Sequence, residues 1–259
     1  MKYNIFYVAF SSIPSSLPSS LQIIKTCENL SKNNYKVTLV KPATGDKKIT
    51  ISKFYDLKFR VNIKEFSRFK SFPLGLNFYL FCFYSLFYIL KKKKSVIITR
   101  NYFLAYLLVL FRKKVILEIH HDTNLEGKIT KFILNNFNFL NQKKIINIVA
   151  ITNSVKNLFV KKYKIEQKKI TVLPSGSSIN IKSQPKLCFN RRLKIGYFGS
   201  ISSSKGINTL IKLSKIDQEN DYYIYGGNRK EILAMKIKNS QKNLFLHHSI
   251  MYADLPRKM

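Results

Sequence analysis

The 259-residue chain contains no tryptophan, only three cysteines and only 13 acidic residues. Cys27, Cys82 and Cys188 lie far apart and show neither CxxC nor Cys/His spacing. The sequence therefore predicts no disulfide framework and no metal site. Because unpaired cysteines are typical of reducing compartments, we expect a cytoplasmic protein, and peripheral association with the inner face of the membrane stays open.

The shortage of acidic residues leaves a large positive charge. The 46 Lys and Arg residues give a formal charge of +33 and a pI near 10.1. A charge of this sign favours an anionic partner, such as a nucleotide, an anionic lipid or a nucleic acid. A codon-composition bias is the competing explanation, because Lys, Asn, Ile, Phe and Tyr are abundant along the whole chain.

A basic nucleic-acid-binding protein is one alternative function. The lysines are spread over the chain rather than gathered on one helix, and the sequence has no RNP, zinc-finger or helix-turn-helix pattern. We therefore expect no specific recognition of nucleic acid.

The sequence also has no hydrophobic run long enough to span a bilayer. The longest run, residues 74–90, contains Gly75, Asn77 and Ser85 and is shorter than the ~20 apolar residues that a spanning helix needs. We predict a helix packed in the core of an α/β domain. Lys91–Lys94 follow this run directly, so docking of the same helix on an anionic membrane surface stays open. Residues 1–10 are interpreted as a buried first strand rather than a signal peptide.

Apolar runs typical of β-strands alternate with helical patterns, which predicts an α/β fold with parallel sheets. The first domain is expected over residues 1–174, followed by a Ser- and Pro-rich linker over 175–192 and a smaller domain over 193–259. Strands are expected at 3–9, 35–41, 95–99, 114–119, 145–151, 170–173, 193–198, 222–225 and 244–247, with one or two more within 47–64. Helices are expected at 19–32, 74–90, 103–111, 125–140, 154–163, 206–215 and 230–238.

One loop in the second domain suits a phosphate or diphosphate. The predicted strand ends at Gly199, a run of small residues follows, and Lys205 and Gly206 open the next helix. Glycine and serine let backbone N–H groups approach a ligand closely, and a helix N-terminus favours negative charge. The order of residues matches neither the Walker loop nor GxGxxG. A small-residue turn with a solvated lysine is the alternative interpretation.

Several neighbouring segments resemble family 4 glycosyltransferases, and they occur in that family's order. The matching segments are 150–176, the loop 199–206, Tyr225–Gly227, 243–248 and 253–256. The resemblance implies a GT-B fold of two Rossmann-like domains. It also implies transfer of a sugar, with retention of configuration, from a nucleotide-diphosphate-sugar to a glycan or lipid-linked acceptor. Relatives commonly build surface polysaccharide or lipopolysaccharide, and they use no cofactor and no obligatory metal.

The resemblance also assigns the candidate site residues. Lys205 and His120 are the candidate catalytic residues. The predicted donor-binding residues are Gly199, Ser200, Lys205, Gly206, Gly226 and Gly227, although many relatives have Arg where this chain has Ser200. On the acceptor or cleft side we expect Ser11, Ser12, Arg100, Glu118 and His121.

The segment from Glu118 to Asp122 follows a predicted strand, at the edge where open α/β sheets bind ligands. We therefore expect a cleft between this segment and the loop 199–206. Adjacent side chains on a strand point to opposite faces, so His120 and His121 are not expected to share a metal.

We expect the second domain to be incomplete, with three strands where such a domain has six. The family's two glutamates, seven residues apart, have no counterpart in this sequence, because Glu219 and Glu231 lie in other settings. One alternative is therefore an inactive or split enzyme with a partner that supplies the remaining segment. Another is a nucleotide-sugar epimerase, for which the sequence shows no carboxylate and histidine acid–base set.

Overall fold

The computed structural model describes residues 4–44, 50–68, 72–176, 192–250 and 252–258. The chain forms two compact units, Met1–Ser177 and Ser178–Met259. Most of the predicted linker, including Cys188, lies outside the described residues. Cys27 and Cys82 are buried free thiols.

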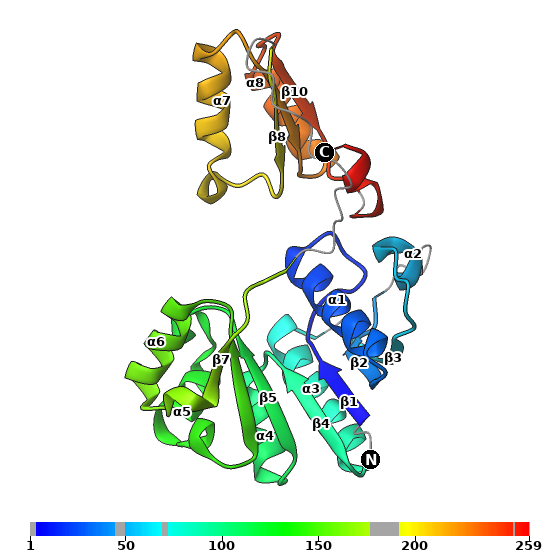
Figure 1. The fold of residues 1–259 in the computed structure, drawn as a ribbon, viewed down its shortest axis with the longest axis vertical. Coiled ribbons are helices and arrows are strands. Elements are labelled where there is room, and N and C mark those ends of the chain that lie inside the picture. Colours follow the sequence, from blue (N-terminus) through cyan, green and yellow to red (C-terminus); the bar gives the residue numbers. More distant parts are fainter. Residues whose placement is uncertain (1–3, 45–49, 69–71, 177–191, 251, 259) are drawn as a thin grey trace. The chain divides into compact units, whose positions relative to one another are not determined.

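The first unit contains a sheet of seven strands in the order β3-β2-β1-β4-β5-β6-β7, and every neighbouring pair is parallel (Figure 1). The order reverses direction between β1 and β4, because β2 and β3 extend to one side of β1 and the later strands to the other. The strands are β1 (Asn4–Val8), β2 (Lys36–Pro42), β3 (Asn62–Phe66), β4 (Ser95–Thr99), β5 (Lys114–Ile119), β6 (Ile145–Ala150) and β7 (Ile170–Val172).

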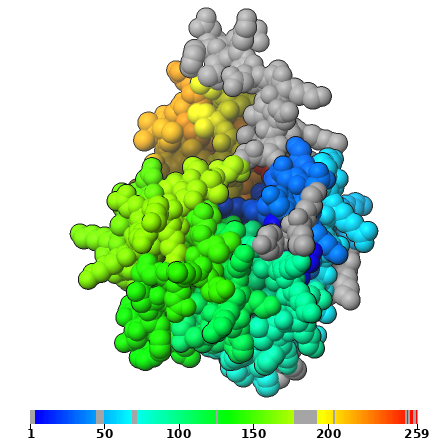
Figure 2. All heavy atoms as spheres, turned by 60° about the horizontal axis from the view of Figure 1, so that its bottom comes forward, coloured from blue at the N-terminus to red at the C-terminus, as the bar shows by residue number. Residues whose placement is uncertain are grey.

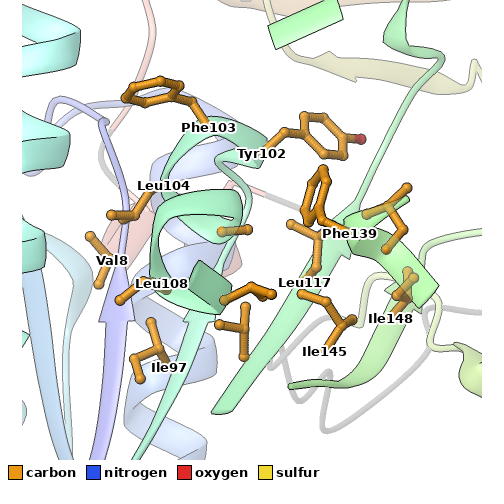
Figure 3. Close-up of a cluster of buried hydrophobic side chains, with 14 of the residues drawn as sticks. Val8, Ile97, Tyr102, Phe103, Leu104, Leu108, Leu117, Phe139, Ile145 and Ile148 are labelled. Atoms are coloured by element: carbon orange, nitrogen blue, oxygen red, sulfur yellow. The ribbon is translucent and has the colours of Figure 1, made fainter. Parts of the chain in front are cut away.

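Helices cover both faces of this sheet, as the alternation of side chains along β1 shows. Phe6 and Val8 enter the larger core under α3, α4, α5 and α6, part of which Figure 3 shows, whereas Ile5 and Tyr7 enter a second core under α1 and α2. Both cores exclude water, which is the main source of stability in a parallel sheet. The helices are α1 (Pro18–Lys32), α2 (Ile51–Tyr55), α3 (Leu74–Leu90), α4 (Tyr102–Leu110), α5 (Lys128–Asn136) and α6 (Asn153–Tyr163), with single 3-10 turns at Thr123–Leu125, Phe139–Asn141 and Gln167–Lys169.

The second unit is a three-stranded parallel sheet in the order β10-β9-β8. Ile224 of β9 and Leu246 of β10 form its core with the two helices that pack on one face. On the opposite face, the rings of Phe198, Tyr225 and His247 stack across the three strands at centroid distances of 5.0 and 4.6 Å. The elements are β8 (Lys194–Phe198), α7 (Ile207–Ile216), β9 (Asp221–Tyr225), α8 (Arg229–Lys238) and β10 (Leu244–His247), with 3-10 turns at Ser203–Lys205 and Tyr252–Arg257.

Two expected elements differ from the structure. One or two strands are expected within 47–64, and β3 does begin there, but α2 precedes it. This helix forms because Thr50 accepts a hydrogen bond from the Lys53 amide at its start and Asp56 ends it in the left-handed conformation. The helix expected over 125–140 is shorter, since α5 starts after Gly127 and ends where Phe137 becomes extended. The apolar helix 74–90 has the expected bounds. Within the described residues, no helix combines the length and apolar character that crossing a bilayer requires.

The start of α8 contains a complete capping box. The Asn228 side chain accepts from the Glu231 amide at 3.0 Å, and the Glu231 carboxylate accepts from the Asn228 amide at 2.6 Å. We expect Asn228→Ala to lower the free energy of unfolding of the second unit by about 1 kcal/mol, and Asn228→Gly by only a few tenths. Denaturant titration monitored by amide exchange in β9 measures both. Equal losses for the two variants would contradict a capping role.

Candidate functional site

Three side chains converge on the edge of the sheet where β1, β4 and β5 end. Tyr7 of β1 donates its hydroxyl hydrogen to Glu118 of β5 at 2.7 Å. Arg100, the residue after β4, donates from Nε to the same Glu118 oxygen at 2.9 Å and to the Tyr7 hydroxyl at 3.0 Å. This group lies at the point where the strand order reverses, which is the usual ligand site of an open α/β sheet.

His120 joins this group at its outer side. Its Nε2 lies 3.5 Å from Glu118 Oε2, and its side chain is 22% exposed, compared with 12% for Glu118. His120 is therefore the member of the group that solvent reaches most easily, whereas Glu118 and Arg100 are less exposed and are paired with each other.

The electrostatics keep Glu118 ionised. Burial alone raises the pKa of its carboxyl. The hydrogen bond with His120, the charge of Arg100 and the hydrogen bond from Tyr7 act in the opposite sense and bring the Glu118 pKa below its ordinary value of 4.5. Burial, followed by the charge of Glu118, raises the pKa of Tyr7, so its hydroxyl stays protonated and remains a donor.

Arg100 has N–H donors left over. Its Nη2 is buried and has no hydrogen-bond partner among the described residues. A guanidinium presents five N–H donors in a planar fork, and here only the Nε side is engaged with Glu118 and Tyr7. The group can therefore offer a charged donor to an oxygen of a ligand at this edge.

The structure separates the remaining candidates of the first unit from this group. His121 lies 3.9 Å from Glu126 and its side chain is 49% exposed, so the two neighbouring histidines, which follow β5, have different partners. Asp122 pairs with Lys162 at 3.0 Å.

Ser11 and Ser12 belong to a separate hydroxyl cluster at the start of α1. The Ser11 hydroxyl lies 2.9 Å from that of Ser20, which is fully buried, and Ser20 donates to the Ser12 carbonyl at 3.0 Å. These contacts hold the loop against α1.

In the second unit, the candidate glycines bring two loops into contact. The Gly199 amide donates to the Tyr225 carbonyl at 3.0 Å, and the Gly226 amide donates to the His247 carbonyl at 3.1 Å. A Cβ on Gly226 would collide with the Gly199 carbonyl group, and Gly227 has a φ of 66° that a side chain disfavours. Glycine at these positions lets the loops that follow β8 and β9 touch.

Lys205 and Gly206 stand at the start of α7. Gly206 has a φ of 75° and supplies no side-chain cap, so the first amides of α7 have no side-chain acceptor, in contrast to α8. Lys205 ends a 3-10 turn, is exposed, and its ammonium makes no ion pair or hydrogen bond within the part of the chain that the structure describes. Ser200 is exposed and its carbonyl accepts from the Tyr197 hydroxyl at 2.8 Å. The arrangement leaves N–H groups and one cation for an anionic ligand.

Tyr7 is the member of the first-unit group that sequence reasoning missed. A tyrosine inside an apolar strand looks like a core residue, and Tyr7 is indeed completely buried. Only the register Tyr7↔Ile98, with β5 next to β4, shows that its hydroxyl reaches the carboxylate two strands away. Among the described residues, no cluster of three or more His, Cys, Asp or Glu side chains suits a metal ion.

The buried ion pair between Arg100 and Glu118 can be tested by its effect on stability. We expect Glu118→Gln to lower the free energy of unfolding by about 3 kcal/mol, because Arg100 keeps its charge in a mostly buried site without a counter-ion. The folded-state pKa of Glu118 is depressed, so its contribution is present above the ordinary value of 4.5 and is lost as the pH falls through the lower folded-state pKa. The variant should therefore lose stability less steeply in acid than the wild type.

The matched control is Glu166→Gln, which breaks the exposed Lys168–Glu166 pair at 3.0 Å. Its effect should stay within about 0.5 kcal/mol. Denaturant titration at several pH values measures both variants. Equal effects for the two would show that Glu118 is not a buried counter-ion.

The glycine contact makes a second test. We expect Gly226→Ala to destabilise the second unit by about 1–3 kcal/mol, because the new methyl group has to displace the backbone at Gly199. Gly75→Ala in α3 meets no atom within 4 Å and should be neutral or stabilising by up to about 1 kcal/mol. Thermal unfolding of both variants checks this, and a neutral Gly226→Ala would contradict the close approach of the loops.

Comparison with known proteins supports the architecture. No known protein-family profile and no curated protein matches the sequence. Solved structures do match. HepE of Anabaena in complex with UDP and glucose aligns with a TM-score of 0.67 at 13% identity, over 99% of this chain and 71% of that one. The lipopolysaccharide outer core galactosyltransferase WaaB aligns with a TM-score of 0.61 at 14% identity, over 100% and 71%.

A protein from Listeria monocytogenes described as a putative UDP-N-acetylglucosamine 2-epimerase also aligns, with a TM-score of 0.61 at 11% identity, over 99% of this chain and 71% of that one. Identities this low establish the fold alone. The two α/β units of this chain therefore have the GT-B fold.

Proposed function

We propose that the protein is a glycosyltransferase that moves a sugar from a nucleotide-diphosphate-sugar to a glycan or lipid-linked acceptor. The observation that carries the proposal is the uncapped start of α7, where Lys205 has no partner among the described residues. The loop before it begins at Gly199, which lies in close contact with Gly226. This loop stands in a GT-B fold, which is used by structures solved with nucleotide or nucleotide-sugar bound.

The chemistry of transfer fits these groups. A nucleotide diphosphate leaves with negative charge as the sugar bond breaks, so fixed donors and cations that surround it accelerate the step. The amides at the start of α7 and the Lys205 ammonium supply both kinds of group. Many family 4 glycosyltransferases have arginine where this chain has Ser200. In this protein, Lys205 therefore supplies more of the positive charge that stabilises the leaving diphosphate. Retention of configuration, with no metal or cofactor, is the course that the resemblance to family 4 enzymes favours.

The group at the end of β1, β4 and β5 suits the sugar or acceptor side. His120 is partly exposed, and its Nε2 lies 3.5 Å from the Glu118 carboxylate, which holds the ring in one orientation. The unpartnered Nη2 of Arg100 supplies a donor for sugar or phosphate oxygens. In this proposal, His120 contacts the transferred sugar, while Glu118 and Tyr7 hold Arg100 and His120 in position.

The structural relatives indicate which substrates to try first. HepE was solved with UDP-glucose, and WaaB is a galactosyltransferase of the lipopolysaccharide outer core. UDP-hexoses are therefore the first donors to assay, with GDP-sugars second. Synthesis of surface polysaccharide or lipopolysaccharide is the corresponding pathway in the proposal.

An epimerase acting on a nucleotide-sugar is the second candidate, favoured by the Listeria relative and by the carboxylate and histidine that the structure brings to 3.5 Å. Glu118 is poorly suited to act as a general base, because its pKa lies below the ordinary value and Arg100 occupies the same oxygen. The two functions differ in their products. An epimerase changes the sugar without an acceptor, whereas a transferase releases UDP in proportion to the acceptor added.

Binding of the diphosphate tests the donor site directly. We expect UDP or GDP to bind and Lys205→Ala to weaken this binding by about 1.5–3 kcal/mol, because a charge-assisted contact is lost. Calorimetry with UDP and GDP measures the affinities. Lys212→Ala, an exposed lysine further along α7, is the matched control and should bind as the wild type does. Equal affinities for the wild type and Lys205→Ala would remove Lys205 from the site.

A further inference from the structure

The outer surface of α3 is unusually apolar. Its inward residues, including Phe81, Cys82 and Leu86, are buried in the core. Its outward residues are apolar as well, with Phe83 41% and Phe87 59% exposed. A surface helix of a globular protein normally carries polar side chains on its outer side. The outer side of α3 therefore lacks the composition of a face that remains in water.

This apolar surface continues onto α4 and α5. Phe83 packs against Phe103 of α4 at 6.0 Å, Tyr106 of α4 packs against Phe137 at 5.2 Å, and Phe137 contacts Phe132 of α5 at 6.1 Å. Figure 2 shows the teal and green parts of the chain, to which these helices belong, next to one another on the surface. We call the apolar surface of these three helices and of the residues that follow them the apolar face, and its exposed members are Leu76, Phe83, Phe87, Leu110, Phe111, Ile129, Phe132 and Phe137.

Basic residues border this face where α3 and α4 end. Lys91–Lys94 follow α3, and residues 112–114 (Arg-Lys-Lys) follow α4. Lys113 donates to the carbonyls of Leu90 and Lys92 at 3.3 and 3.0 Å, which joins the two runs into one cluster. Across residues 67–117 the sequence has ten Lys and Arg and no Asp or Glu. The charged residues of this stretch of the sequence are therefore all basic.

We propose that the apolar face docks on an anionic lipid bilayer, with its phenylalanines at the acyl boundary and the basic cluster on the lipid headgroups. Exposed aromatic and aliphatic side chains next to lysines form the pattern of interfacial membrane binding. The positive charge of the basic cluster favours an anionic bilayer as the partner that binds this face. A second copy of the chain would bring its own basic cluster to the same contact, and like charges would repel. The sheet edge that carries His120 lies at the opposite ends of β4 and β5 from this cluster, so docking leaves that edge accessible.

Vesicle flotation tests the proposal with the full chain. Binding is expected to vesicles of phosphatidylcholine with phosphatidylglycerol and to be weak with phosphatidylcholine alone. Phe87→Ser and Phe132→Ser should each weaken binding on the order of tenfold, because a buried phenylalanine is lost. Lys91→Ala combined with Lys93→Ala should weaken it by a similar factor. Ile237→Ser, at an 86% exposed position of the second unit, is the matched apolar control and should have no effect.

The absence of tryptophan supplies an independent readout. Phe87→Trp places a single indole on the apolar face, and its emission should shift to the blue with anionic vesicles and be quenched by brominated lipid chains. Ile237→Trp should show neither effect. Circular dichroism confirms that each variant is folded.

Three results would overturn the proposal. One is equal binding to the two kinds of vesicle, or to neither. Another is anionic binding that the phenylalanine variants leave unchanged, which would mean attraction by charge without docking of the face. The third is a concentration-dependent dimer that Phe87→Ser abolishes while vesicle binding persists, which would make a second copy the occupant. None of these readouts requires sugar transfer, so they stand apart from the proposed activity.

Discussion

The arrangement of chemistry in the first unit depends on parallel pairing in register. Val8 lies opposite Thr99, and Thr99 opposite Leu117, so the residues that follow or end β1, β4 and β5 are brought to a single edge. With antiparallel pairing, Arg100 and Glu118 would lie at opposite ends of neighbouring strands. The buried salt bridge and its Tyr7 partner follow from this register, and the two packed helical layers maintain it.

The same constraint explains what sequence could predict. Apolar runs identified β4, β5 and β10 with their bounds. For β4 and β5 the reason is that a parallel strand covered on both faces is a nearly continuous apolar segment. The ends of these and similar runs placed His120 and Gly199 just after strands. The segment before β3 was harder, because the five-residue α2 depends on a cap at Thr50 and a left-handed Asp56 rather than on a hydrophobic pattern.

The contacts between strands could not be predicted. The hydroxyl of Tyr7 reaches a carboxylate 111 positions later, and no local pattern distinguishes it from a packing residue. The contact of Ser11 and Ser12 with α1 is of the same kind. The Ser11 hydroxyl lies next to that of the buried Ser20, and Ser20 donates to the Ser12 carbonyl, which the sequence of this loop does not indicate. In the second unit, the family resemblance indicated Gly226, whereas the structural reason for a glycine there, the carbonyl of Gly199 next to it, is visible only in three dimensions.

The central position of β1 also has a consequence for biosynthesis. One of its neighbours is β4, and the Thr99 hydroxyl that donates to the Val8 carbonyl is 91 positions later in the chain. While the ribosome synthesises the intervening residues, β1 can pair with β2 but its other edge stays open. An open edge of an apolar strand is prone to wrong pairing, and non-local contacts form slowly. β1 is therefore synthesised well before the strand that completes its pairing, and its open edge is exposed to wrong pairing during that interval, which is the situation in which chaperones act.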